Sequence, residues 1–140
     1  MDPNNHVVKL CAEGMEAEVD GRWDVARALF DRAWEASNGD FEACVAAHYV
    51  ARHQPDAAGA LHWNRIALER AELAKDDSVR EFYASLHLNL GHAYELTGDP
   101  TTACHQYTLA RARLDDVPPG PYRDMVRTGV DAGTTRVCES

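Results

Sequence analysis

The fold is decided by residues 90–110, which read LGHAYELTGDPTTACHQYTLA. Gly91 is the second residue of this stretch, and two alanines, Ala103 and Ala110, lie on either side of Tyr107. Their spacing of four and then three residues places the alanines and the tyrosine on one face of a helix. Because a small–large–small face lets another helix approach closely, the stretch predicts two helices packed as a hairpin.

The same pattern occurs twice more, nearer the N-terminus. The three alanine-flanked triplets are Ala26, Phe30 and Ala33, then Ala60, Asn64 and Ala67, then Ala103, Tyr107 and Ala110. The first interval is 34 residues and the second is 43, which is 34 plus an insertion of nine. A close-contact position lies twelve residues before the first alanine of each triplet, at Gly14, His48 and Gly91. A turn residue lies five residues before the same alanine, at Gly21, Pro55 and Gly98. A period of about 34 residues indicates a repeat of helix hairpins.

With these residues the chain resembles the tetratricopeptide repeat family. The third unit matches most clearly, because it also has Leu90 before its glycine and Tyr94 after it. The second unit is the most degenerate, with His48 for the small residue and Asn64 for the aromatic one, and the neighbouring Trp63 is expected to supply the missing bulk. The insertion, around residues 74–82, resembles the longer-helix variant found in kinesin light chains and in peptide-sensing bacterial regulators.

The resemblance implies an all-α fold, a right-handed superhelical array of three antiparallel helix hairpins plus a C-terminal capping helix. The repeats are expected at about 7–39, 41–83 and 84–117, and the cap at about 121–137. Helices are expected near 5–19, 23–37, 40–53, 56–75, 78–97, 100–115 and 121–137, with Asp40 and Ser78 as N-caps and Pro100 in a first turn.

The last predicted helix follows a run of prolines and a glycine at residues 118–121 that breaks the pattern. After it, apolar residues such as Met125, Val126 and Val130 recur at helical spacing. A helix here would cover the apolar face of the last repeat. The alternative is a flexible tail, because glycine and threonine are poor helix formers.

Composition bounds the class of protein. A chain of 140 residues forms one domain with a core that needs no metal or disulfide. No stretch approaches the roughly 18 apolar residues of a membrane helix, and the polar start over residues 1–5 is not a secretory signal. We therefore expect a cytoplasmic protein. The four cysteines, Cys11, Cys44, Cys104 and Cys138, have no paired spacing and are expected to be buried or half-buried thiols.

No catalytic or metal-binding residue is predicted, and no cofactor is expected. Cys44 and His48 lie four residues apart, a spacing that suits a thiolate–imidazole pair, but both should face the partner helix. His48 and His53, like His87 and His92, are five apart, which turns them to different faces rather than to one chelating edge.

Charge limits the partners. The net charge of −9 comes from the first 110 residues, since the last thirty hold five acidic and five basic side chains. An acidic surface repels phosphate backbones, so a nucleic-acid partner is not expected. It favours a basic partner, although a solvated acidic surface needs no partner at all.

The resemblance places function on a concave groove lined by the first helix of each hairpin. Family members that grip a chaperone's C-terminal carboxylate use lysines, an arginine and asparagines there, and of those only Asn89 survives here. The remaining groove suits an extended or helical peptide, with apolar contacts, a flat tyrosine and polar groups. The six candidate groove residues are Met15, Val45, Tyr49, Arg52, Asn89 and His92.

Two functions follow. The first is a non-catalytic adaptor or regulatory module that binds a protein or peptide segment in the groove. The alternative is a structural protein whose groove or terminal helix forms a homo-oligomer. A third possibility is that the chain's own ends cover the apolar strip, because bare apolar patches are rare in monomers.

Overall fold

The computed structural model describes residues 4–139 and is all-α within that range. The seven α-helices are α1 (His6–Val19), α2 (Trp23–Ala36), α3 (Asp40–Val50), α4 (Ala57–Ala74), α5 (Tyr83–Leu96), α6 (Pro100–Ala112) and α7 (Pro121–Val137). Short 3₁₀ helices follow α3, α4 and α6, at η1 (Ala51–His53), η2 (Asp77–Phe82) and η3 (Leu114–Asp116). The expected all-α class is therefore confirmed. None of the described helices combines the length and the apolar character that crossing a membrane requires.

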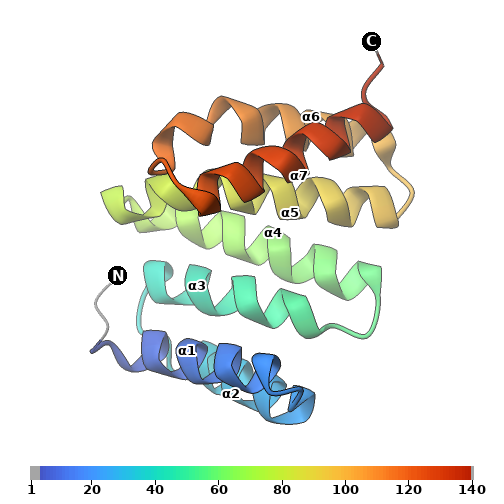
Figure 1. Ribbon diagram of the computed structural model, residues 1–140. Coiled ribbons are helices and arrows are strands. Elements are labelled where there is room, and N and C mark those ends of the chain that lie inside the picture. The colour runs from blue at the N-terminus through green and yellow to red at the C-terminus, as the bar shows by residue number, and fades with distance from the viewer. Residues whose placement is uncertain (1–3, 140) are drawn as a thin grey trace.

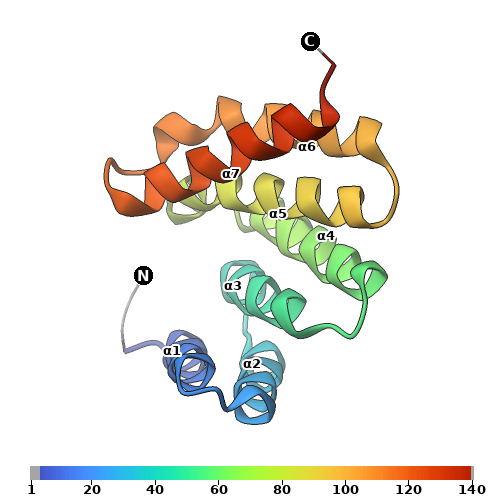
Figure 2. The same cartoon turned by 45° about the vertical axis from the view of Figure 1, so that its right-hand side comes forward.

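Helices that follow one another in the chain also lie next to one another in space. The closest associations are those of α1 with α2, α3 with α4, and α5 with α6. The stack runs in chain order from α1 and α2 at one end to α6 and α7 at the other (Figure 1). Turning the molecule keeps this order, with α3 and α4 between the two ends (Figure 2).

The core is distributed along the stack rather than gathered at one centre. Three adjoining clusters of buried apolar residues lie between successive helices: one around Phe30, one around Ala67 and Leu86, and one around Val126. α3 contributes to the first two clusters and α5 to the last two, so these helices are buried on more than one face. Each helix is thus held by its neighbours in the chain, which is how stacked helix pairs gain stability.

The alanine triplets lie at the tightest contacts. Five of the six alanines are fully buried, with 0% exposure, and Ala60 is half-buried. Gly14 faces the ring of Phe30, and Gly91 faces the ring of Tyr107, where an added Cβ would lie 2.6 Å from Cε1. No other residue fits these two places without displacing an aromatic ring.

The turns and caps agree only in part with the sequence predictions. Gly21 and Gly98 do turn the chain, with φ of 75° and 85°, and Pro100 opens α6, which Asp99 caps by accepting from Thr102 N at 3.1 Å.

The two predicted N-caps were wrong. Asp40 is the first residue of α3 and makes no cap hydrogen bond, because its carboxylate pairs with Arg70 at 3.0 Å. Ser78 lies inside η2, which Asp76 caps by accepting from Ser78 N at 2.9 Å. The insertion therefore forms a separate 3₁₀ helix, and α5 begins only at Tyr83, instead of one long helix from 78.

The segment after the proline run forms a helix, α7, rather than a flexible tail. It packs against α6 and α5, and Val126, Val130 and Gly133 are the residues it buries. Gly133 lies against the ring of Tyr107, so that ring is held between two glycines, one on α5 and one on α7. The outward side of α7 is exposed and largely polar, which suits the last helix of a stack.

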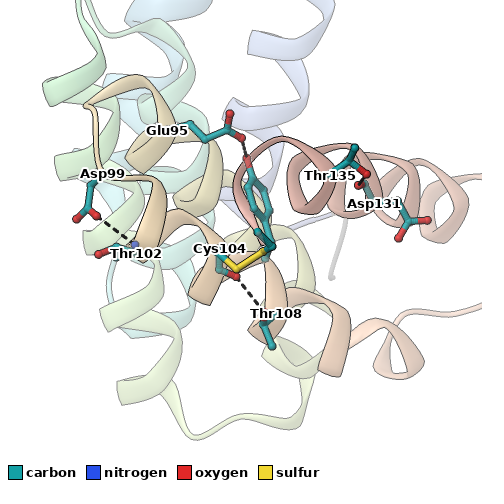
Figure 3. The surroundings of a disulfide bond; sticks show 9 residues. Glu95, Asp99, Thr102, Cys104, Thr108, Asp131 and Thr135 are labelled. Carbon is teal, nitrogen blue, oxygen red and sulfur yellow. Dashed lines mark hydrogen bonds between the residues drawn. A yellow bond between two sulfur atoms is a disulfide. The ribbon is translucent and has the colours of Figure 1, made fainter. Parts of the chain in front are cut away.

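The expectation of four unpaired thiols was wrong for two of them. Cys104 and Cys138 form a disulfide with a Cα–Cα distance of 5.2 Å, which joins α6 to the residue after α7. Figure 3 shows Cys104 beside the part of α7 that carries Asp131 and Thr135. Sequence spacing gave no sign of this pair, because 34 residues separate the two cysteines and only the packing of α7 on α6 brings them together. Disulfides persist mainly in oxidising compartments, so this bond gives no support to the expected cytoplasmic location.

Candidate functional site

A cavity lies between the helices on one side of the stack. Its volume is about 450 Å³, and it is lined by residues of α1, α3, η1, α5 and α7 together with the end of η2. Most of its wall is apolar. The lining residues are Met15, Cys44, Val45, His48, Tyr49, Arg52, Phe82, Ser85, Leu86, Leu88, Asn89, Tyr122, Met125 and Val126.

Five of the six candidate groove residues lie in this cavity. They are Met15, Val45, Tyr49, Arg52 and Asn89, which come from α1, α3, η1 and α5. The sixth, His92, lies in an adjoining hollow, which shares His48, Arg52, Asn89 and Met125 with the cavity. The helices that the repeat pattern selects as groove-lining thus bring most of the set together.

The helix α7 also lines the cavity, which the sequence pattern did not indicate. Tyr122, Met125 and Val126 form one wall of the cavity, and the hydroxyls of Tyr122 and Ser85 are hydrogen-bonded. This contact fixes the start of α7 against α5. The apolar stripe of α7 was visible in the sequence, but which side of the stack it covers depends on how α7 packs against α6.

Two neutral polar side chains, Asn89 and His48, contact each other in the wall of the cavity. Asn89 Nδ2 lies 3.3 Å from His48 Nδ1, so the amide donates and the imidazole accepts. Burial lowers the pKa of His48 to about 4, and the nearby positive charge of Arg52 adds to the effect. His48 is therefore an uncharged imidazole at neutral pH.

An ion-pair cluster lies at the edge of the cavity. Glu18 accepts from Arg52 at 3.2 Å and lies 2.7 Å from His53 Nε2. The Arg52 guanidinium also lies 5.7 Å from the centre of the Tyr49 ring, and that ring stacks on Phe30 with centroids 5.1 Å apart. Because Arg52 is already paired, the cavity presents a neutralised cation rather than a free one.

The geometry does not favour a cysteine nucleophile at Cys44. Burial raises the pKa of the Cys44 thiol to about 12, so the thiol is protonated at neutral pH, whereas nucleophilic cysteines need a stabilised thiolate. His48 lies one turn away, but its hydrogen bond goes to Asn89. Over residues 4–139, no cluster of three or more histidine, cysteine or carboxylate side chains has the arrangement of a metal site.

Comparisons of the chain with models of protein families, with curated proteins and with solved structures found no match.

Proposed function

We propose that this chain is a non-catalytic interaction module that binds a peptide or protein segment in the cavity-bearing face of a tetratricopeptide-like array. The observation that carries the proposal is the cavity itself, which is mainly apolar and has a small set of convergent polar groups. Sites that recognise peptides and small ligands share this composition. The residues with acid–base or nucleophilic potential in its wall, Cys44 and His48, are buried in forms that suit packing and hydrogen bonding.

Three features support the comparison with a tetratricopeptide array. The repeat interval of 34 residues is that of the family, the glycine–aromatic contacts recur at equivalent places in the first and third units, and α7 covers the end of the stack. The right-handed superhelix and the adaptor role are parts of the same proposal.

Two exposed methionines at the mouth of the cavity support a docking role. Met125 is 63% exposed and Met15 is 42% exposed, and they come from opposite walls. Large apolar side chains left in water beside a cavity are typical of a surface that a partner covers. Methionine also adapts its shape to different partners.

The net charge of −9 favours a partner segment that is basic around its apolar contact. The same charge opposes the alternative, in which a second copy of this acidic chain fills the site. A homo-oligomer therefore stands as the second function and is separated from the first by the test below.

The proposal is tested by selecting binders from a displayed library of random peptides on the immobilised full chain, then measuring their affinity by calorimetry. Met125→Glu should weaken selected peptides at least tenfold, because it places a charge on the apolar mouth without disturbing the core. Leu73→Glu is the matched control, since Leu73 is 53% exposed on α4 and lies outside the cavity. Equal effects of the two substitutions on peptide affinity would contradict the proposal. The proposal would also be contradicted if light scattering showed that the mass of the native chain doubles with concentration while that of the Met125→Glu variant does not.

A further inference from the structure

The size of the cavity limits what enters it. One turn of an α-helix, about 10 Å across and about 5.4 Å long, fills roughly 420 Å³. The cavity holds about 450 Å³, which is the volume of about one such turn, and Tyr122 and Met125 of α7 line one side of it. One large side chain of a partner, with the atoms next to it, therefore fits inside, whereas a longer helical segment does not.

The charge of the cavity limits the chemistry of that side chain. Among the lining residues, Arg52 is the one that carries a full charge at neutral pH, and Glu18 already pairs with it. A charged group pushed into this wall would lose its hydration without gaining an opposite charge, which is costly. The occupant is therefore uncharged.

An available hydrogen-bond acceptor in the cavity wall indicates that the occupant carries a donor. Asn89 uses Nδ2 for the bond to His48, and this is the one side-chain hydrogen bond that Asn89 makes within residues 4–139, which leaves its Oδ1 available as an acceptor. The rest of the wall is rich in aromatic rings and methionine, from Tyr49, Phe82, Tyr122, Met15 and Met125. Rings and thioethers pack well against an aromatic group.

We propose that the cavity receives one uncharged aromatic side chain of the partner, of the tryptophan or tyrosine kind, whose N–H or O–H donates to Asn89 Oδ1. This inference rests on the proposed function, because it names the anchor by which a partner segment is held. Such aromatic anchors with a polar tip often dominate interface energetics.

The test uses three probes that differ in one group each: indole, 1-methylindole and indole-3-carboxylate. Each is titrated at millimolar concentration into the ¹⁵N-labelled full chain, followed by two-dimensional NMR. Indole should shift the side-chain amide of Asn89 and the backbone amide of Ser85. 1-Methylindole lacks the N–H donor and should bind about two- to tenfold more weakly, and the carboxylate should bind more weakly than indole.

Two variants locate the effect. Asn89→Ala should abolish the difference between indole and 1-methylindole, because it removes the acceptor. Met125→Glu should weaken indole binding while Leu73→Glu leaves it unchanged. Equal binding of indole and 1-methylindole, or binding of the carboxylate at least as tight as that of indole, would overturn the inference. If the Asn89 resonance moves on simple dilution without any probe, a second copy occupies the cavity and the inference also fails.

Failure here is distinguishable from failure of the proposed function. If the probes do not bind but library peptides do, and Met125→Glu weakens them, the module binds peptides through an anchor of another chemistry. If neither probes nor peptides bind, both proposals fall.

Discussion

The chain has three pairs of closely packed successive helices, α1 with α2, α3 with α4 and α5 with α6, referred to below as the first, middle and third hairpins. The two outer pairs and the middle pair fill the contact between their helices in opposite ways. In each outer pair, a glycine on the first helix lies under an aromatic ring on the second, as Gly14 does under Phe30 and Gly91 under Tyr107. At the equivalent places the middle hairpin has His48 and Asn64. In this pair the larger residue, His48, is therefore on the first helix. Trp63, beside Asn64 on the second helix, packs edge-on against Trp34 with ring centroids 5.0 Å apart.

This exchange shows where the stack has room for a polar group. In the outer hairpins the first helix presents only a hydrogen atom at this position, so nothing projects from it. In the middle hairpin His48 reaches the cavity and meets Asn89 of the next unit. The unit that departs most from the repeat pattern is thus the one that supplies the central polar contact of the candidate site.

The largest expected effect on stability comes from placing leucine at two equivalent positions, Gly91 of the third hairpin and His48 of the middle one. Gly91→Leu should abolish cooperative unfolding of the third hairpin or cost about 3 kcal/mol or more, because Tyr107 is held between Gly91 and Gly133 and cannot move aside. His48→Leu should cost only about 1 kcal/mol at pH 7, since a side chain of similar size already fills that space and one hydrogen bond is lost. Urea denaturation followed by circular dichroism measures both, and equal costs would break the comparison.

The next expected effect tests how the first and third hairpins differ in what stabilises them. The third hairpin is tied to α7 by a disulfide across 34 residues, whereas the first is joined to its neighbours by packing and by non-covalent contacts such as the ion pair of Glu18 with Arg52. Replacing Cys104 and Cys138 by serine together should lower the free energy of unfolding by about 2–4 kcal/mol. Hydrogen exchange should accelerate in α6 and α7 and stay unchanged in α1 and α2. Dithiothreitol should reproduce the loss in the native chain and do nothing to the double variant; a uniform acceleration would contradict the local role of the bond.

The third expected effect is a pH dependence of the free energy of unfolding that comes from His48 in the middle hairpin. Burial lowers the pKa of His48 to about 4, while the unfolded chain titrates near its ordinary value of about 6.5. Between these values the unfolded state binds more protons, so stability falls as the pH is lowered through this window. Between pH 7 and pH 5 this amounts to about 1–2 kcal/mol.

His48→Leu should lose that part of the pH dependence. The slope that remains includes His87, whose pKa is also lowered, mainly by burial. Urea titrations at both pH values provide the measurement, and identical slopes for the variant and the native chain would show that His48 titrates freely.

The smallest expected effect comes from a substitution that gives the third hairpin the same aromatic residue, phenylalanine, as the first. Tyr107 differs from Phe30 by a hydroxyl that donates to Glu95, which in turn accepts from Arg136 of α7 at 2.9 Å. Tyr107→Phe should cost about 1 kcal/mol, because the ring contact with the glycines survives and one hydrogen bond is lost. Arg111→Ala is a control from the exposed ion pair with Asp131 and should cost less. A larger loss in the control would contradict the role given to the hydroxyl.

The repeat pattern predicted more of the fold than of the site. Helix positions followed from the alanines and glycines, because a close helix contact tolerates few residue types and so leaves a mark in the sequence. The predicted caps at Asp40 and Ser78 were wrong, because a carboxylate or hydroxyl near a helix start has competing partners, such as Arg70, that local sequence does not show. Five of the candidate groove residues lie in the cavity, while His92 lies in the adjoining hollow, and Met125 of α7 lines both.

The sequence by itself determined the all-α class, the order of the helices and the face on which α1, α3 and α5 present their side chains, because these depend on periodicity along a single helix. The tertiary structure alone decided the disulfide between Cys104 and Cys138, the bond between Ser85 and Tyr122, and the contribution of α7 to the wall of the cavity. These features depend on where α7 lies over α5 and α6. That placement follows from the fit of Gly133 against Tyr107 and of the buried valines against the last hairpin, and contacts between distant residues leave no spacing in the sequence.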